Sequence, residues 1–367
     1  TVSSISTSSA SMGSAVTFEN AATAEMSAAY DTANDRIVIA YRDDANSDYG
    51  TAIVGTVSGT SISFGTAVVF NSGSISRNDI AFDSSNNKVL IVFDDNQDAA
   101  GESIVGTVDP SDNSISFGSE VQFNNFAVDY PSVAFDSTNN KLIVAYKDSG
   151  DTNNGECRVG TISGTSISYG SVATFNSAVT NDIKAIYDSG SDKTIIVYGD
   201  AGNSTQGTAV VGTVSGTSIS FGSESVFETG TTQYSTGVYD PDNNKTNVFY
   251  MDGGDSDKGK AVIGTVSGSS ISFTSPSNFY TDAGINALTA VYDSNADKSV
   301  IGIRGASAYG YAIPITSDGS SFTVGSSTTI TTNAYGTNAA SVFDPDQKKV
   351  VFAYQDGDDS DKGKAQV

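Results

Sequence analysis

The sequence predicts an all-β fold, a single seven-bladed β-propeller of four-stranded antiparallel blades. Three observations support this prediction: a repeat of nearly constant length, four strand-like runs in each repeat, and two ends of the chain that complement each other. Internal repetition of this kind is typical of propellers. Each repeat is marked by an aromatic residue followed by Asp, and successive Asp residues lie 51 to 53 positions apart. The dipeptides are Tyr30-Asp31, Phe82-Asp83, Phe135-Asp136, Tyr187-Asp188, Tyr239-Asp240, Tyr292-Asp293 and Phe343-Asp344.

Each repeat contains four short runs, which we name strands a to d from the expected ring centre outward. In the first repeat they cover residues 26–31, 36–41, 50–57 and 61–70. The runs are rich in Val, Ile, Thr, Phe and Tyr, and residues typical of turns separate them. A glycine such as Gly55 recurs inside strand c, and we expect it to make room for a large ring on a neighbouring strand.

The two ends of the chain predict how the ring closes. Residues 1–18 resemble strand d of the other repeats, for example residues 56–70. Residues 354–367 run from the end of strand b through strand c and then stop. We therefore expect one domain over residues 1–367, with about 52 residues per blade, in which residues 1–18 complete the last blade.

The composition excludes several classes of partner. The chain has 367 residues, with 42 acidic and 18 basic side chains and a net charge of −24. Nucleic acids and anionic membranes bind clusters of Lys and Arg, so neither is an expected partner. No apolar run is long enough to span a bilayer, so membrane insertion is not expected either.

The composition also argues against catalysis. The chain has no His and a single Cys, Cys157, which excludes a Ser-His-Asp triad and the usual His/Cys zinc sites. A sialidase-like site would need several converging Arg residues, and the chain has few. We expect that the protein is not an enzyme. The acidic side chains leave one alternative open, a polysaccharide-active enzyme that uses a pair of carboxylates.

The connections between strands indicate where a ligand would bind. The a–b and c–d hairpins are short and alike and would share one end of the ring, whereas the longer b–c and d–a loops would share the other. Variable loops on a rigid scaffold carry binding residues. Exposed Tyr beside Asn, Asp and Gln suits sugar recognition. The predicted ligand-binding residues are Tyr130, Tyr234, Tyr335 and, from the divergent sixth repeat, Arg304.

Two b–c loops are rich in acidic residues that are followed by Gly. Closely spaced carboxylates of this kind are candidate calcium ligands, although the bidentate Glu of an EF-hand is missing. The alternative is that these Asp side chains cap tight turns, as Asp commonly does. The candidate metal ligands are Asp252, Asp255, Asp257, Asp356, Asp358 and Asp361, with calcium as the only expected cofactor.

Three segments carry a family resemblance: YRDDANSDYGTAIVGTVSGTSISFG (41–65), YGDAGNSTQGTAVVGTVSGTSISFG (198–222) and YMDGGDSDKGKAVIGTVSGSSISF (250–273). They resemble a repeat of marine phage and marine bacterial proteins of the tail-fibre, adhesin or surface type. The resemblance implies an extracellular or virion-surface module that binds a cell-surface glycan or protein. The alternative is a structural or decorating subunit of a virion or extracellular assembly, with other subunits or copies of itself as partners.

Overall fold

A computed structural model describes residues 10–150 and 152–367 and confirms the predicted all-β fold with antiparallel strands. Strand a of each repeat ends at the aromatic-Asp dipeptide. In β1, β5 and β19 the same continuous strand also includes part of strand d of the preceding repeat. The strands that contain strand a are β1 (Val16–Asp31), β5 (Val68–Asp83), β10 (Val128–Asp136), β15 (Thr180–Asp188), β19 (Ser225–Asp240), β24 (Ala287–Asp293) and β29 (Ala340–Asp344).

Strands b and c follow within each repeat and pair antiparallel with each other. The b strands are β2 (Arg36–Asp43), β6 (Lys88–Asp95), β11 (Lys141–Asp148), β16 (Lys193–Asp200), β20 (Lys245–Asp252), β25 (Lys298–Arg304) and β30 (Lys349–Asp356). The c strands are β3 (Tyr49–Ser58), β7 (Ala100–Asp109), β12 (Gly155–Ser163), β17 (Gln206–Ser215), β21 (Lys258–Ser267), β26 (Gly310–Ser317) and β31 (Lys362–Gln366).

Strand d is divided into two pieces that both pair with strand c. The first pieces are β4 (Ser61–Phe64), β8 (Ser114–Phe117), β13 (Ser166–Tyr169), β18 (Ser218–Phe221), β22 (Ser270–Phe273) and β27 (Phe322–Val324). The second pieces are β9 (Val121–Asn124), β14 (Ala173–Asn176), β23 (Ser277–Tyr280), β28 (Thr328–Thr331) and the first parts of β1, β5 and β19. Three b–c loops contain the short 3-10 helices η1 (Asp44–Asn46), η2 (Ala201–Asn203) and η3 (Gly253–Asp255).

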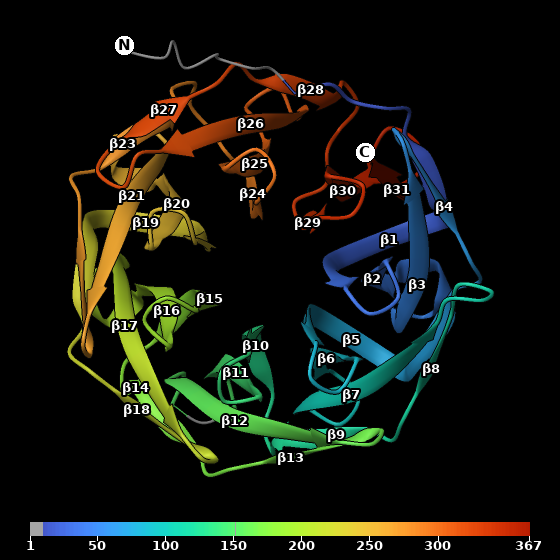
Figure 1. The fold of residues 1–367 in the computed structure, drawn as a ribbon, viewed down its shortest axis with the longest axis horizontal. Helices are drawn as coiled ribbons and strands as arrows, with labels where there is room; N and C mark the ends of the chain where they lie inside the picture. The colour runs from blue at the N-terminus through green and yellow to red at the C-terminus, as the bar shows by residue number, and fades with distance from the viewer. Residues whose placement is uncertain (1–9, 151) are drawn as a thin grey trace.

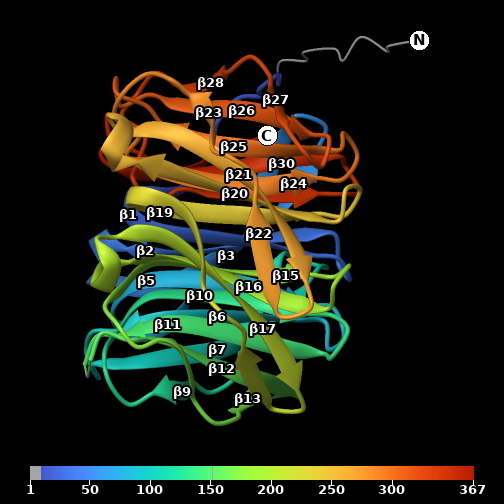
Figure 2. The same cartoon turned by 90° about the vertical axis from the view of Figure 1, so that its left-hand side faces the viewer.

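The sheets stand around a ring, with β10, β15 and β24 near its centre and β13 and β27 at its outside (Figure 1). In the side view the strands of successive sheets lie in a stack (Figure 2). At the point where the chain ends meet, β1 pairs with β31, and Val16 lies opposite Ala365. Within the segment 1–18, whose pairing with the last blade was predicted, Val16 and Thr17 pair with β31, and residues 1–9 lie outside the described part. None of the helices in the described ranges is long and apolar enough to cross a membrane.

The core lies between neighbouring sheets. Each hydrophobic cluster joins side chains of two successive repeats, and one cluster joins β1 to β3 with β29 to β31. Aromatic rings recur in these layers, for example Phe175 with its centroid 5.2 Å from that of Tyr198. The predicted role of the strand c glycines is confirmed, because a Cβ on Gly55 would lie 2.8 Å from the ring of Phe64.

The a–b hairpins repeat one polar contact. Asp136 is buried at the end of β10, and its carboxylate accepts hydrogen bonds from the backbone N–H groups of Thr138 and Asn139 at 3.1 and 2.9 Å. The same pair of contacts recurs at Asp31, Asp83, Asp188, Asp240, Asp293 and Asp344. The Asp of the marker dipeptide is therefore a turn-capping residue.

Candidate functional site

A β-bulge interrupts strand a in the first five repeats, close to its first residues. In β10 the register with β11 shifts between Asp129 and Ser132, so two residues lie opposite one. One bulge residue in each of these repeats has a positive φ of 43 to 51°, although none of them is Gly. Such a backbone is costly for a large side chain and recurs at functional sites. The residues are Glu25, Arg77, Tyr130, Asp182 and Tyr234.

These bulge residues surround a cavity on the ring axis. A space of about 420 Å³ is lined by Arg77, Tyr130, Asp182 and Tyr234, together with Gln233 and other residues. A second space of about 250 Å³ shares three of these residues and continues along the a strands of all the repeats. We call the two together the axial cavity. A volume of this order accommodates a small ligand.

Tyr130 and Arg77 contact each other in the larger of the two spaces, which we call the mouth of the axial cavity. The guanidinium carbon of Arg77 lies 4.1 Å from the centroid of the Tyr130 ring, within the range of a cation–π interaction. Arg77 also forms an ion pair with Asp129, and the ammonium of Lys147 lies 3.6 Å from the same carboxylate. The Arg77 cation therefore lies over the Tyr130 ring and is held there by the Asp129 carboxylate, which Lys147 also contacts.

Deeper in the axial cavity a polar network fixes the walls. The Asp79 carboxylate accepts hydrogen bonds from the Ser132 hydroxyl and the Val133 N–H, at 2.9 and 3.0 Å, and pairs with Lys184 at 2.9 Å. These contacts join β5, β10 and β15, the a strands of three successive repeats. Between the first and seventh repeats the Asn338 amide donates to the Glu25 carboxylate at 2.8 Å.

Burial shifts the pKa values of several groups around the axial cavity. Loss of hydration raises the pKa of Asp182 to about 6, although the positive charge of Arg77 opposes the shift. The same cause raises the pKa of Glu25, again against the charge of Arg77. Burial, together with the charge of Asp182, raises the pKa of Tyr130 to about 12. At neutral pH Tyr130 is therefore a hydroxyl that can donate a hydrogen bond.

Two of the predicted ligand-binding residues meet at this site and two do not. Tyr130 and Tyr234 both line the axial cavity. Tyr335 was expected to be exposed, but only 1% of it is accessible, and its ring stacks on that of Tyr354. The Tyr335 ring packs against Gly310. In most other repeats a Phe ring of strand d covers the equivalent Gly, but strand d of this repeat has Ile330, which does not reach Gly310. Arg304 ends β25 and is not among the residues that line the axial cavity.

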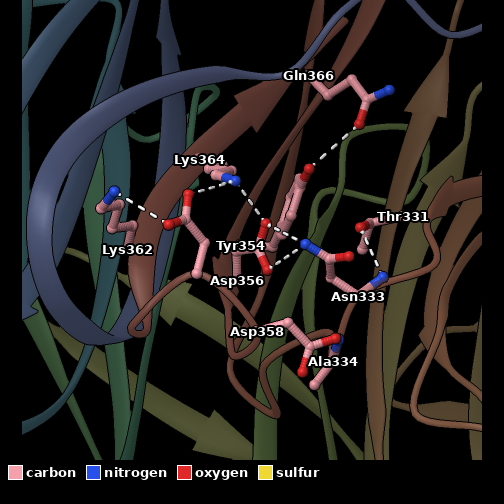
Figure 3. A network of polar contacts seen from close by, with 10 residues as sticks. Thr331, Asn333, Ala334, Tyr354, Asp356, Asp358, Lys362, Lys364 and Gln366 are labelled. Carbon is pink, nitrogen blue, oxygen red and sulfur yellow. Dashed lines mark hydrogen bonds and ion pairs between the residues drawn. The ribbon is translucent and has the colours of Figure 1, made fainter.

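The acidic loops chosen as calcium sites contain lysine ammonium groups beside their carboxylates. Lys260 lies 2.5 Å from Asp252 and 3.3 Å from Asp255. Lys364 lies 2.6 Å from Asp356, which also accepts two hydrogen bonds from the Asn333 amide (Figure 3).

The other members of the predicted metal set have local roles in these loops. Asp358 accepts a hydrogen bond from the Ala334 N–H, and Asp257 and Asp361 have left-handed backbone conformations. In the described residues, the carboxylates that converge closely enough to hold a metal ion are instead Asp95, Asp98 and Glu102.

Arg77, Asp182 and Glu25 were not predicted as site residues, although the sequence contains a pattern that identifies them. Each lies five residues before the aromatic residue of its marker dipeptide, as Tyr130 and Tyr234 do. Most positions of the repeat hold similar residues, whereas this one changes from acid to base to aromatic. When one position varies in repeats of nearly constant length, that position indicates a surface at which each repeat contributes a different side chain to a binding site.

No family model matches the chain, and no curated protein sequence does. Among solved structures, it is similar to the BP39L lectin of Burkholderia pseudomallei, with a TM-score of 0.69, 11% identity, and coverage of 95% of this chain and 96% of the lectin. It is also similar to NanB with Optactamide (TM-score 0.55, 12% identity, 95% and 69% coverage). Saccharomyces cerevisiae Sqt1 gives a TM-score of 0.54 at 10% identity, with 95% and 84% coverage. At these identities the similarity establishes the fold, and function has to be argued from the site.

Proposed function

We propose that the chain is a seven-bladed β-propeller closed by pairing of β1 with β31, and that it is a non-catalytic carbohydrate-binding module. Its ligand binds in the mouth of the axial cavity. We place the module outside the cell or on a virion surface, where it attaches to a glycan of the target surface.

One observation carries the proposal. Five equivalent positions of a regular repeat hold Glu25, Arg77, Tyr130, Asp182 and Tyr234, and all five have the same strained backbone and line the axial cavity. A scaffold that needed only to close a ring would have no reason to vary these side chains. Their variety gives an asymmetric site on a nearly symmetric frame.

The chemistry of the mouth suits a sugar. Tyr rings offer flat apolar surface, while a carboxylate, two amides and a guanidinium can pair with several hydroxyl groups. The local basic groups Arg77, Lys147 and Lys184 also offset nearby acids, so the mouth is less repulsive than the net charge of −24 implies. A neutral or weakly acidic sugar is the expected ligand.

The test is a glycan array probed with labelled wild-type protein and with Tyr130→Ala. We expect wild type to bind defined glycans and Tyr130→Ala to bind them at least about tenfold more weakly, because the ring and the cation–π contact are lost together. Tyr239→Phe is the control, since its hydroxyl donates to Asn244 in an a–b hairpin at the other end of the ring. Equal binding by all three proteins would contradict the proposed site.

A carboxylate-dependent enzyme is the second candidate, because Glu25 and Asp182 both have raised pKa values and line the axial cavity. A general acid of a glycosidase needs such a pKa. Incubation with the glycans that bind, followed by chromatography of the products, separates the two functions. We expect the glycans to be recovered intact, and release of shorter products would replace the binding module with an enzyme.

A subunit role gives a different result in the same experiments. A decorating protein would be favoured by two results together. The protein would bind no glycan on the array, and images of a native particle would show this chain in contact with other subunits through the face that contains the axial cavity. Images in which the cavity faces outward support the binding module.

A further inference from the structure

Among the residues that the structure describes, the b–c loops of three repeats hold the same pair of Asp residues, and they differ in what lies beside the pair. The first Asp ends strand b and is buried: Asp252 is 3% exposed, Asp356 2% and Asp95 3%. The second Asp follows three residues later, as Asp255, Asp359 and Asp98. The three loops therefore place two carboxylates at equivalent points of the fold.

In two of these loops a lysine on strand c bridges the pair, and a second lysine, Lys258 or Lys362, pairs with the outer acid. Lys260, opposite Tyr250, contacts Asp252 and Asp255 at 2.5 and 3.3 Å. Lys364, opposite Tyr354, contacts Asp356 and Asp359 at 2.6 and 2.9 Å. Figure 3 shows Lys364 directed at the Asp356 carboxylate. Each ammonium bridges both acids of its loop.

In the β6–β7 loop the equivalent residue is Glu102, which lies opposite Phe93 as the lysines lie opposite their tyrosines. Its carboxylate oxygen, with one oxygen each from Asp95 and Asp98, forms a group in which all three atoms lie within 4.8 Å of one another. Glu102 is only 7% exposed, and its Oε2 atom has no hydrogen-bond partner in the described structure. A buried carboxylate oxygen without a partner is a costly arrangement.

A further acid makes the charge problem larger. The Asn71 amide donates to Asp95 at 2.9 Å and to Glu120 at 3.0 Å, so Glu120 lies beside the same group. Glu120, Asp95 and Asp98 therefore surround Glu102 with like charge. Where the other two loops have an ammonium among two carboxylates, this one has a third carboxylate. A cation from solution would restore the balance.

We propose that Asp95, Asp98 and Glu102 bind a calcium ion, which takes the place that the ammonium groups of Lys260 and Lys364 hold in the two equivalent loops. All the donors are hard oxygens, which favours Ca²⁺ or Mg²⁺ over Zn²⁺ or Cu²⁺. Ca²⁺ tolerates irregular geometry and six to eight oxygen ligands, so a loop of three carboxylates with neighbouring water suits it better than Mg²⁺. The assignment does not depend on the proposed sugar site.

The direct test uses the full chain, stripped with EDTA and desalted, and calcium chloride alone as the probe. We expect calorimetric titration to give one site per chain and the melting temperature to rise by several degrees at saturation, because the ion binds only the folded state. Magnesium should give a smaller rise. No heat and no shift in melting temperature at pH 8 would overturn the proposal and leave a proton on Glu102 as the compensating charge.

The matched variant is Glu102→Lys, which gives this loop the bridging lysine of the two equivalent loops, although Ala100 remains where they have Lys258 and Lys362. We expect it to melt, without calcium, at least as high as the calcium-loaded wild type and to bind no calcium. Glu102→Gln keeps the size of the side chain and should weaken calcium binding at least tenfold, which covers the case in which the lysine variant does not fold. Lys260→Gln is the control and should bind calcium as wild type does. Retained binding by Glu102→Gln, or its loss in Lys260→Gln, would contradict the assignment to this loop.

Discussion

The two ends of the ring use the same repeat in opposite ways. At the end formed by the a–b hairpins, each repeat contributes the same buried Asp with the same two backbone contacts, as at Asp136. At the axial cavity the equivalent positions hold an acid, a base and aromatic rings, as at Asp182, Arg77 and Tyr130. The repeats of one chain can therefore be compared with one another as homologous sequences usually are. Positions that hold the same residue in every repeat indicate a requirement of folding, and positions that vary indicate recognition.

The largest expected effect comes from breaking the uniform end. Asp136→Ala leaves the N–H groups of Thr138 and Asn139 and the Asn139 amide without their acceptor. We expect a loss of about 3 kcal/mol in the free energy of unfolding. Urea denaturation measures it, and sugar binding in native conditions should be unchanged. If Asp136→Ala bound the sugar more weakly under conditions in which all of the protein is folded, the separation between a folding role at one end and a binding role at the other would be contradicted.

A smaller effect on the free energy of unfolding, of opposite sign, is expected from Asp182 at the axial cavity. The pKa of Asp182 rises from 3.8 to about 6, so the folded state holds a proton between these values that the unfolded chain releases. Wild-type stability should therefore fall through this interval as pH rises, and the full penalty remains above pH 6. The shift corresponds to roughly 3 kcal/mol, which partial exposure reduces to about 2 kcal/mol.

Asp182→Asn isolates this contribution. It should match wild type near pH 3.5 and be more stable by about 2 kcal/mol at pH 8, because the amide carries no charge to bury. Urea denaturation at the two pH values provides the difference. Equal stability of the two proteins at pH 8 would mean that Arg77 fully compensates the carboxylate.

The smallest effect sharpens the comparison within the mouth itself. Arg77→Met removes the guanidinium from the Tyr130 ring and from Asp129 while keeping much of the apolar stem. Arg77 is 39% exposed, so we expect less than about 1 kcal/mol of stability to be lost. Sugar affinity should fall about fivefold. Isothermal titration with a glycan from the array tests this, and unchanged affinity would assign Arg77 to positioning of the wall alone.

Much of the architecture was predictable because a β-strand has a local pattern. The runs of strands b and c and the turns follow from short runs rich in Val, Ile, Thr, Phe and Tyr that turn residues separate. The β1–β31 pairing follows from the match between residues 1–18 and other repeats. The location of Tyr335 did not follow. Its burial depends on the combination of Ile330 and Gly310, which leaves a space that only the three-dimensional packing reveals.

The site itself was predicted in part. Tyr130 and Tyr234 were identifiable as loop tyrosines, but the positive φ at Asp182 and Arg77 has no local signal, since neither residue is Gly. It is imposed by the register on both sides of the bulge. The b–c loops were correctly identified as acidic. The ion pairs that their carboxylates make with Lys260 and Lys364 were not predicted, because these lysines lie on strand c.

The pairing of β1 with β31 also sets the order in which the molecule can be assembled. These strands lie almost a full chain apart in sequence, so their contact carries the greatest loop-closure cost of any in the ring. On a ribosome, the edge of β1 at this joint stays unpaired until β31 has emerged. During that time the nascent chain presents an open sheet edge to its neighbours, and crowding in the cell becomes a determinant of yield.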